Sequence, residues 1–267
     1  MSLFESLILG IIQGLTEFLP VSSSGHLEIF QEIFSSDYHP KESLLMTITL
    51  HAATAMSTVF YFRKDIGFIF KELMRFEKSE SLYFALKIIL SMIPAVIVGL
   101  FFEDFIASLF DRNLLLVGFM LLITAFLLFQ ADRIGKDKKK LNYRSALLIG
   151  VIQAIAILPG ISRSGATITL AVFLGIDRER AARFSFLMVI PLIFGSMVKS
   201  LSEIDSVTRS PDFLSLLVGF IAAFITGVFA CKWMIALVKK SQLKYFSFYC
   251  IVCLLYTSPS PRDSDSS

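Results

Sequence analysis

Charged side chains are scarce in this sequence and make up only 18% of its 267 residues. Hydrophobic residues make up 55%, and the mean hydropathy is +0.72, which is above the range of a water-soluble domain. So few charges cannot keep this much apolar surface in water. We therefore expect most of the chain to lie in a lipid bilayer.

Cysteine is nearly absent as well. Cys231, Cys250 and Cys253 have no metal-type spacing and lie in or beside apolar segments, which excludes a disulfide scaffold and a zinc site. We expect them to be inert packing residues. The apolar start of the chain contains Glu17 and lacks a basic leader followed by a small-residue cleavage site, so we expect no removable signal peptide.

The sequence contains five long apolar runs. Each is close to the roughly 20 residues that a membrane-spanning helix requires. The five runs are residues 44–62, 82–102, 114–131, 184–198 and 213–233. The sequence therefore predicts an all-α integral membrane protein, a polytopic helical bundle with at least these five crossings.

The net charge of +3 is unevenly distributed. Two connecting segments are basic, and the segment between residues 102 and 114 is acidic. The basic segments hold Arg63, Lys64, Lys71, Arg75 and Lys78, and then Arg133, Lys136, Lys138, Lys139, Lys140 and Arg144. The positive-inside rule places both basic loops in the cytoplasm and the acidic loop outside. We interpret the basic loops as topology signals that contact membrane lipid, and not as a nucleic-acid site, because no soluble basic domain is present.

A repeat is hidden in the apolar sequence. ILGIIQ at residues 8–13 matches LIGVIQ at 148–153, and PVSSSG at 20–25 mirrors PGISRSG at 159–165. Proline, glycine and clustered serines cannot continue a helix through lipid unless a protein-lined cavity satisfies the freed backbone groups. The two copies therefore predict two re-entrant helical hairpins.

The topology makes these hairpins enter from opposite faces, the first from outside and the second from the cytoplasm. A hairpin followed by three spans, repeated in reverse orientation, is an inverted repeat with its ligand site near the midplane. We expect one transmembrane domain over residues 1–252, with repeat 1 at about 1–135 and repeat 2 at about 140–252.

The end of the chain departs from this pattern. After Phe246 the apolar run is only about half a bilayer long, and a polar tail follows. CLLYTS at residues 253–258 could be translated from a sequencing adapter. We hypothesise that residues 253–267 are a non-native tail that replaces a truncated last helix.

Ionisable residues inside apolar segments are costly and are therefore functional candidates. Glu17, His26, His51 and Arg163 are the outstanding ones, and Gln13 lies one helical turn before Glu17 on the same face. A carboxylate can hold a cation or accept a proton, and a histidine can act as acid, base or nucleophile. The plainer interpretation makes His51 a polar lining residue and Gln13 a link between helices.

The two serine-rich turns complement each other. Ser22 and Ser23 offer hydroxyls beside Glu17, and a neighbouring base could activate such a serine. The second turn combines hydroxyls, a guanidinium fork and a probable helix N-terminus, which suits phosphate. Its residues are Ser162, Arg163, Ser164, Gly165 and Thr167. The two turns together predict a hydrolytic site, although a serine-rich turn by itself is often only a turn.

GLTEFLPVSSSGH at residues 14–26 and PGISRSGAT at 159–167 closely resemble the two signature motifs of the undecaprenyl-diphosphatase family, also called bacitracin-resistance proteins. The resemblance covers the chain up to the suspect tail. It implies a hydrolase of the bacterial cytoplasmic membrane that converts undecaprenyl diphosphate to undecaprenyl phosphate and inorganic phosphate. This reaction recycles the lipid carrier for peptidoglycan synthesis and confers bacitracin resistance.

The resemblance also implies roles for the candidate residues. Glu17, Ser23, His26 and Arg163 inherit the catalytic role, and a divalent cation, Mg²⁺ or Ca²⁺, would be held partly by Glu17. The diphosphate would bind Ser22, Ser162, Arg163, Ser164, Gly165 and Thr167, with Gln13 and His51 in support. The family accepts Glu or Gln at position 13, so Gln13 leaves Glu17 as the main carboxylate.

Several alternatives stay open at this point. The nucleophile is Ser23, His26 or water, and all three fit the same residues. A lipid-phosphate transporter or flippase would use the same architecture and the same phosphate-binding arginine. The outward-entering first hairpin and the resemblance favour a site that faces the outer leaflet. The sequence leaves open whether the protein forms a homodimer.

Overall fold

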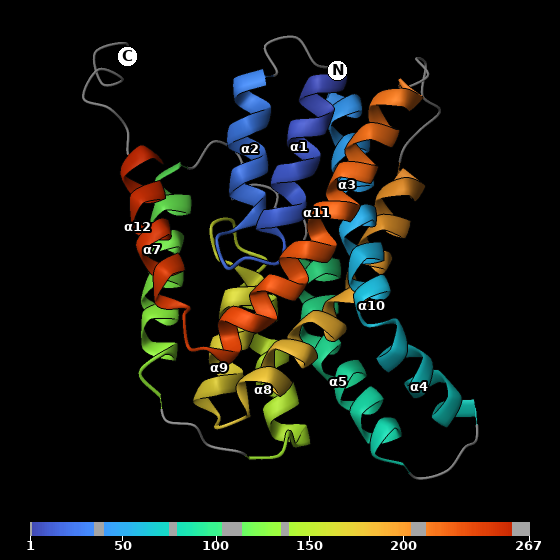
Figure 1. Cartoon of the computed structure of the whole chain (residues 1–267), viewed down its shortest axis with the longest axis vertical. Helices are drawn as coiled ribbons and strands as arrows, with labels where there is room; N and C mark the ends of the chain where they lie inside the picture. Colours follow the sequence, from blue (N-terminus) through green and yellow to red (C-terminus); the bar gives the residue numbers. More distant parts are fainter. Residues whose placement is uncertain are drawn as a thin grey trace.

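The computed structural model describes residues 2–34, 40–74, 79–102, 114–134, 139–203 and 212–257. Within these ranges all the named secondary-structure elements are helices (Figure 1). The helices are α1 (Leu3–Thr16), α2 (Ser23–Phe34), α3 (Pro40–Tyr61), α4 (Arg63–Met74), α5 (Glu80–Phe101), α7 (Leu114–Ala131), α8 (Tyr143–Ile155), α9 (Arg163–Phe173), α10 (Arg178–Glu203), α11 (Phe213–Lys239) and α12 (Lys244–Thr257). The predicted all-α class is confirmed.

Four helices in the described ranges are long and apolar enough to cross a membrane. They contain the spans Leu44–Tyr61, Glu80–Phe101, Arg178–Ser200 and Phe213–Lys239. These match four of the five predicted runs, so the multi-pass membrane architecture is confirmed. The fifth run forms α7, whose apolar part Leu116–Ala131 is shorter, and its crossing stays a prediction.

The segment after the first long span is helical, and its prediction as a plain connecting loop was wrong. It forms α4, with Asp65 in the first turn and Lys71 in the last turn, where each complements the helix dipole. Phe68 and Phe70 are exposed on the same helix. Apolar and basic side chains together suit a helix at the boundary between lipid and water.

The chain leaves the helical conformation at both predicted positions, between α1 and α2 and between α8 and α9. α1 and α2 form one pair of helices and α8 and α9 another, and Figure 1 shows the pairs at opposite ends of the molecule. Ser22 (φ 67°) and Gly160 (φ 90°) adopt left-handed conformations that reverse the chain. The turns meet, because a Cβ atom on Gly165 would lie 3.0 Å from the Cβ of Pro20. Re-entry into the bilayer and the inverted repeat stay predictions.

Glycines let the first helix of each pair approach a long helix from the other half of the chain. A Cβ atom on Gly10 would lie 2.5 Å from the carbonyl oxygen of Gly219, so α1 packs tightly on α11. Gly150, at the matching repeat position, lies against the backbone of Ser91, so α8 packs on α5. Small residues at close crossings are typical of helix packing in membranes. Each pair is therefore held by the other half of the chain.

We expect Gly14→Ala to destabilise the protein by about 1–3 kcal/mol or more. The added Cβ would lie 2.7 Å from the carbonyl oxygen of Ala223 and 2.9 Å from the amide nitrogen of Gly227, so α1 would have to move away from α11. Thermal unfolding in detergent measures the change. In the control Gly67→Ala nothing lies within 4 Å of the new atom, and a gain of about 0.5–1 kcal/mol is expected. Equal unfolding temperatures for the two variants would contradict this account of the packing.

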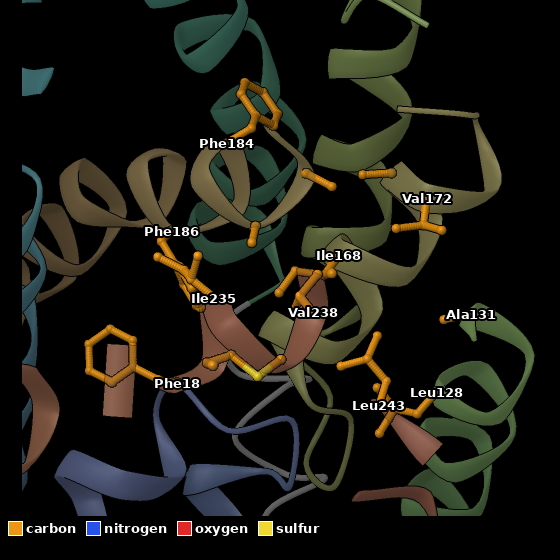
Figure 2. Close-up of a cluster of buried hydrophobic side chains, with 14 of the residues drawn as sticks. Phe18, Leu128, Ala131, Ile168, Val172, Phe184, Phe186, Ile235, Val238 and Leu243 are labelled. Carbon is orange, nitrogen blue, oxygen red and sulfur yellow. The ribbon is translucent and has the colours of Figure 1, made fainter. Parts of the chain in front are cut away.

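The main hydrophobic core lies beside the first turn (Figure 2). Phe18, the residue after Glu17, is 2% exposed and packs edge-on against Phe186 of α10, with ring centroids 5.6 Å apart. Ile168 of α9 and Ile235 of α11 belong to the same cluster. The turn that carries Glu17 is therefore anchored in tightly packed side chains.

The hypothesis about the last residues is largely untested. α12 extends to Thr257, and residues 258–267 lie outside the described ranges. The foreign origin of the tail and the truncation of a last helix stay predictions. Cys231 and Cys250 are buried free thiols, which fits the packing role that the sequence predicted.

Candidate active site

Glu17 is the centre of a buried polar cluster and is itself 7% exposed. Its Oε2 accepts hydrogen bonds from Gln13 Nε2 and from Ser23 Oγ, each at 3.0 Å, and its Oε1 forms an ion pair with Arg163 Nη2. The Nε2 atom of His51 lies 4.0 Å from Oε2. A charge buried at membrane depth needs an opposite charge, and here Glu17 and Arg163 supply it to each other.

The ends of three helices fix these side chains. Glu17 caps the end of α1, where its amide donates to the carbonyl of Gln13. Ser23 begins α2 directly after the left-handed Ser22, and Arg163 begins α9. The two turns therefore bring together residues 146 positions apart in the chain.

The second turn is held by its own hydroxyls and by α7. Ser162 Oγ accepts from the amide of Gly165 at 3.2 Å and lies 3.3 Å from Ser164 Oγ. Thr124 Oγ1 accepts from the amide of Ser162 at 3.1 Å and donates to the carbonyl of Gly160 at 3.4 Å. Thr124 was not predicted, because one threonine within an apolar run gives no sequence signal.

A cavity of about 720 Å³ lies against the cluster. Its polar lining comes from both turns and includes Glu17, Ser22, Ser23, Ser24, His51, Gln153, Ser162, Arg163 and Ser164. Its apolar lining comes mainly from α5 and α10 and includes Met92, Ala95, Val96, Leu100, Pro191 and Leu192. A polar pocket that continues into an apolar wall suits an amphiphilic ligand.

Two of the predicted phosphate-binding residues are not in this lining. The amide of Gly165 is used by the Ser162 cap, and the hydroxyl of Thr167 donates to the carbonyl of Arg163 at 2.9 Å. Ser22, Ser162, Arg163 and Ser164 do line the cavity. Gly165 and Thr167 therefore shape the turn, and their contact with phosphate stays a prediction.

His26 is not brought together with Glu17. Its Nδ1 lies 2.8 Å from the carbonyl oxygen of Ser22, and its Nε2 lies 2.7 Å from the hydroxyl of Tyr249, whose ring stacks on the imidazole. A carbonyl oxygen only accepts, so Nδ1 donates, and the Nε2 of the neutral ring accepts from Tyr249. Both ring nitrogens are engaged, and a catalytic role for His26 stays a prediction.

His51 is the histidine that lines the cavity. Its Nδ1 donates to the carbonyl of Thr47 at 2.9 Å, which leaves Nε2 turned toward Glu17. The sequence assigned His51 a supporting role, and its position beside the carboxylate fits that assignment.

A family model described as bacitracin resistance protein BacA matches residues 6–255. The chain belongs to this family. It is 58% identical over 252 residues to the undecaprenyl-diphosphatase of Christiangramia forsetii, an alignment that covers 94% of this chain and 96% of the relative. It is 47% identical over 257 residues to the undecaprenyl-diphosphatase of Bacteroides thetaiotaomicron, with the same coverage.

A third relative is the undecaprenyl-diphosphatase of Methanococcus vannielii, which is 41% identical over 256 residues and is covered over 98% of its length. The resemblance drawn from the two motifs is therefore confirmed. The three relatives share the name of a diphosphatase, and the comparisons do not support the transporter alternative.

The described part of this family member has no cluster of three or more His, Cys, Asp or Glu residues that would form a complete metal site. It does contain an oxygen that suits a cation, because Gln13 Oε1 is buried beside Glu17 without a hydrogen-bond donor. Magnesium is often held by one or two carboxylates together with the phosphates of the substrate. Glu17 and Gln13 fit a cation that is bound in this way.

Several polar residues of the cavity lining were not predicted as site residues. Gln153 and Lys199 both line it, and neither was among the predicted site residues. The repeat aligns Gln153 with Gln13, and that alignment was the available signal. Lys199 stands near the end of a long apolar helix, where lysines are common for topological reasons.

Proposed function

We propose that the protein hydrolyses undecaprenyl diphosphate to undecaprenyl phosphate and inorganic phosphate in the bacterial cytoplasmic membrane, and so recycles the lipid carrier for peptidoglycan synthesis. One observation carries the proposal: Arg163, Glu17 and Ser23 form a connected cluster beside a cavity whose wall is apolar. The names of the relatives give the same activity.

The diphosphate would bind between the two turns. α2 begins at Ser23 and α9 begins at Arg163, and both residues line the cavity, so two helix N-termini lie at its wall. Their partial positive charges and the guanidinium of Arg163 favour a bound anion. The serine hydroxyls at both N-termini add hydrogen-bond donors.

Binding would also activate the nucleophile. A diphosphate competes with Glu17 for the guanidinium of Arg163, which would free the Oε1 atom of Glu17 from its ion pair. Ser23 already donates its hydroxyl hydrogen to Glu17 at 3.0 Å, so the carboxylate is placed to take the Ser23 proton. This makes Ser23 the proposed nucleophile among the three candidates.

The bond changes follow from this placement. Ser23 Oγ bonds to the terminal phosphorus while the bond from that phosphorus to the bridging oxygen breaks, and undecaprenyl phosphate leaves with the electron pair. Water then attacks the phosphoserine, inorganic phosphate leaves, and the proton on Glu17 returns to Ser23. Arg163 would stabilise the charge on the transferred phosphoryl group in both steps.

A divalent cation, Mg²⁺ or Ca²⁺, would be held by Gln13 Oε1 and by the Glu17 oxygen that Arg163 releases. Such a cation neutralises charge on a diphosphate and so makes the leaving group better. The residues of the chain still bind the substrate and transfer the proton.

The prenyl chain would lie along the apolar wall of the cavity. Met92, Val96 and Leu100 recur along one side of α5, and Pro191 and Leu192 of α10 contribute to the same lining. We place the end of the molecule with α4 and the start of α8 in the cytoplasm by its basic residues. The cavity includes Lys199, near the other end of α10, so it would open toward the outer leaflet.

Purified full-length protein in detergent, supplied with undecaprenyl diphosphate, is expected to release inorganic phosphate. The phosphate is measured colorimetrically against protein-free samples and against the Arg163→Ala variant. A folded protein that binds the lipid diphosphate and releases no phosphate would overturn the proposal and would favour lipid transport as the function.

Chelation of divalent cations is expected to reduce phosphate release to below about a tenth of its rate, because the diphosphate charge would then be met only by protein groups. Adding back Mg²⁺ or Ca²⁺ should restore it, and Gln13→Leu should raise the cation concentration needed for half-maximal rate. An unchanged rate of phosphate release in EDTA would show that the reaction does not need a divalent cation.

A further inference from the structure

Gln153 is a buried amide without a partner in the cavity wall. It lies in the last turn of α8 and is 2% exposed, and neither its Nε2 nor its Oε1 has a hydrogen-bond partner among the described residues. Buried side-chain polar groups are mostly hydrogen-bonded, and one left without a partner reduces stability. Since Gln153 lines the same cavity as Arg163 and Ser162, a bound ligand is the natural source of its partner.

The matching residue of the first repeat shows what Gln153 lacks. Gln13 donates its Nε2 hydrogen to Glu17, four residues later. The residue four positions after Gln153 is Ile157, whose side chain has no acceptor and which also lines the cavity. The same amide therefore has a carboxylate partner within the chain in one repeat and none in the other.

A link between helices does not account for Gln153. α8 is seated on α5 by Gly150, whose missing side chain lets the backbone of Ser91 approach. In the described part of the chain α5 gives no hydrogen-bond partner to either amide atom of Gln153. The contact between the helices is thus made by small residues one turn earlier.

We propose that Gln153 is a substrate-binding residue whose amide donates a hydrogen bond to a non-bridging oxygen of the lipid diphosphate. A neutral donor suits this position, because the guanidinium of Arg163, which lines the cavity, is already balanced by Glu17. A lysine or arginine at position 153 would be an uncompensated charge whenever the site is empty. The inference rests on the proposed hydrolysis of a lipid diphosphate.

Gln153→Met tests the proposal, because methionine has a similar length, volume and helix propensity and no strong hydrogen-bonding group. The KM for undecaprenyl diphosphate is expected to rise about tenfold or more, which is the loss of one hydrogen bond to a charged group. The unfolding temperature of the lipid-free protein should rise by about 2 °C or more, because an amide without a partner is removed.

Gln13→Met is the matched control. It removes a donor from the buried carboxylate of Glu17, so its unfolding temperature should fall. Gln153→Glu keeps the shape but replaces the donor with a negative charge, and its KM should exceed that of Gln153→Met. A stabilising substitution at 153 beside a destabilising one at 13 distinguishes ligand binding from packing.

Three results would overturn the proposal. The first is an unchanged KM in Gln153→Met, and the second is a raised KM together with a lower unfolding temperature, which is the signature of a structural role. The third is a Gln153→Glu protein with the KM of the wild type, which would make the side chain an acceptor. Failure of the wild-type protein to release phosphate would instead refute the proposed function itself.

Discussion

Arg163→Ala is expected to lower the rate of phosphate release by about three orders of magnitude or more, which is the effect of removing an arginine that stabilises phosphoryl transfer. Arg163 begins α9 beside the cavity and is the charge partner of Glu17 in the empty site. The variant lacks the guanidinium group whose positive charge would bind the diphosphate. The measurement is the initial rate at saturating undecaprenyl diphosphate.

Removing Arg163 also leaves Glu17 as an unpaired buried charge, which by itself destabilises a fold by about 3–5 kcal/mol. Arg163→Lys therefore serves as the second variant, because it keeps the charge but loses the two-pronged guanidinium. It should fold and should still release phosphate more slowly than the wild type. Arg183→Ala, at an exposed ion pair with Asp65, is the control and should retain the rate within about twofold. Wild-type rates in both Arg163 variants would remove this residue from the site.

The second large effect is expected for Ser23→Ala, which should lower the turnover number by about four orders of magnitude if Ser23 is the nucleophile. Ser23 is the serine whose hydroxyl donates to Glu17, and it lines the cavity. Rapid quenching in acid during turnover should trap a phosphoserine at this position in the wild type. The assay reads phosphate release and the trapped phosphoenzyme together.

Ser24→Ala is the matched control for this experiment. Ser24 lines the same cavity, but its hydroxyl lies 3.4 Å from that of Ser22 and has no bond to Glu17 among the described contacts. Its loss should cost less than about tenfold, as expected for one ordinary hydrogen bond. If Ser23→Ala keeps a tenth of the wild-type rate, Ser23 is not the nucleophile, and water is the attacking group if no phosphoenzyme is trapped. A phosphoenzyme on His26 that is trapped by an alkaline quench and lost in acid would mean histidine attack.

Much of the site could be predicted from the sequence, because charge at membrane depth leaves few alternatives. Glu17 and Arg163 stand in apolar segments, where an ionisable residue is costly, so both were predicted as site residues, and the structure pairs them across 146 positions. The serines and prolines fixed where the helices break. The membrane class followed from apolar run lengths alone.

The roles of the two histidines could not be predicted, because each depends on what surrounds the ring. His26 stands beside the serine turn in the sequence, yet Tyr249, 223 positions away, occupies its Nε2. His51 stands apart in the sequence, and packing of α3 against α1 brings it to Glu17. α4 was missed because its charged residues resembled those of a connecting loop.

The packing of α1 on α11 also sets the order in which the protein can be completed during synthesis. α1 enters the membrane early, but the glycine surface that receives it belongs to one of the last helices to leave the ribosome. Arg163, which balances Glu17, is also translated in the second half of the chain. Until Arg163 is made, Glu17 therefore lacks the charge partner that it has in the folded protein. A ribosome that stalls before α11 would leave behind a recognisable, charge-bearing fragment for membrane quality control to remove.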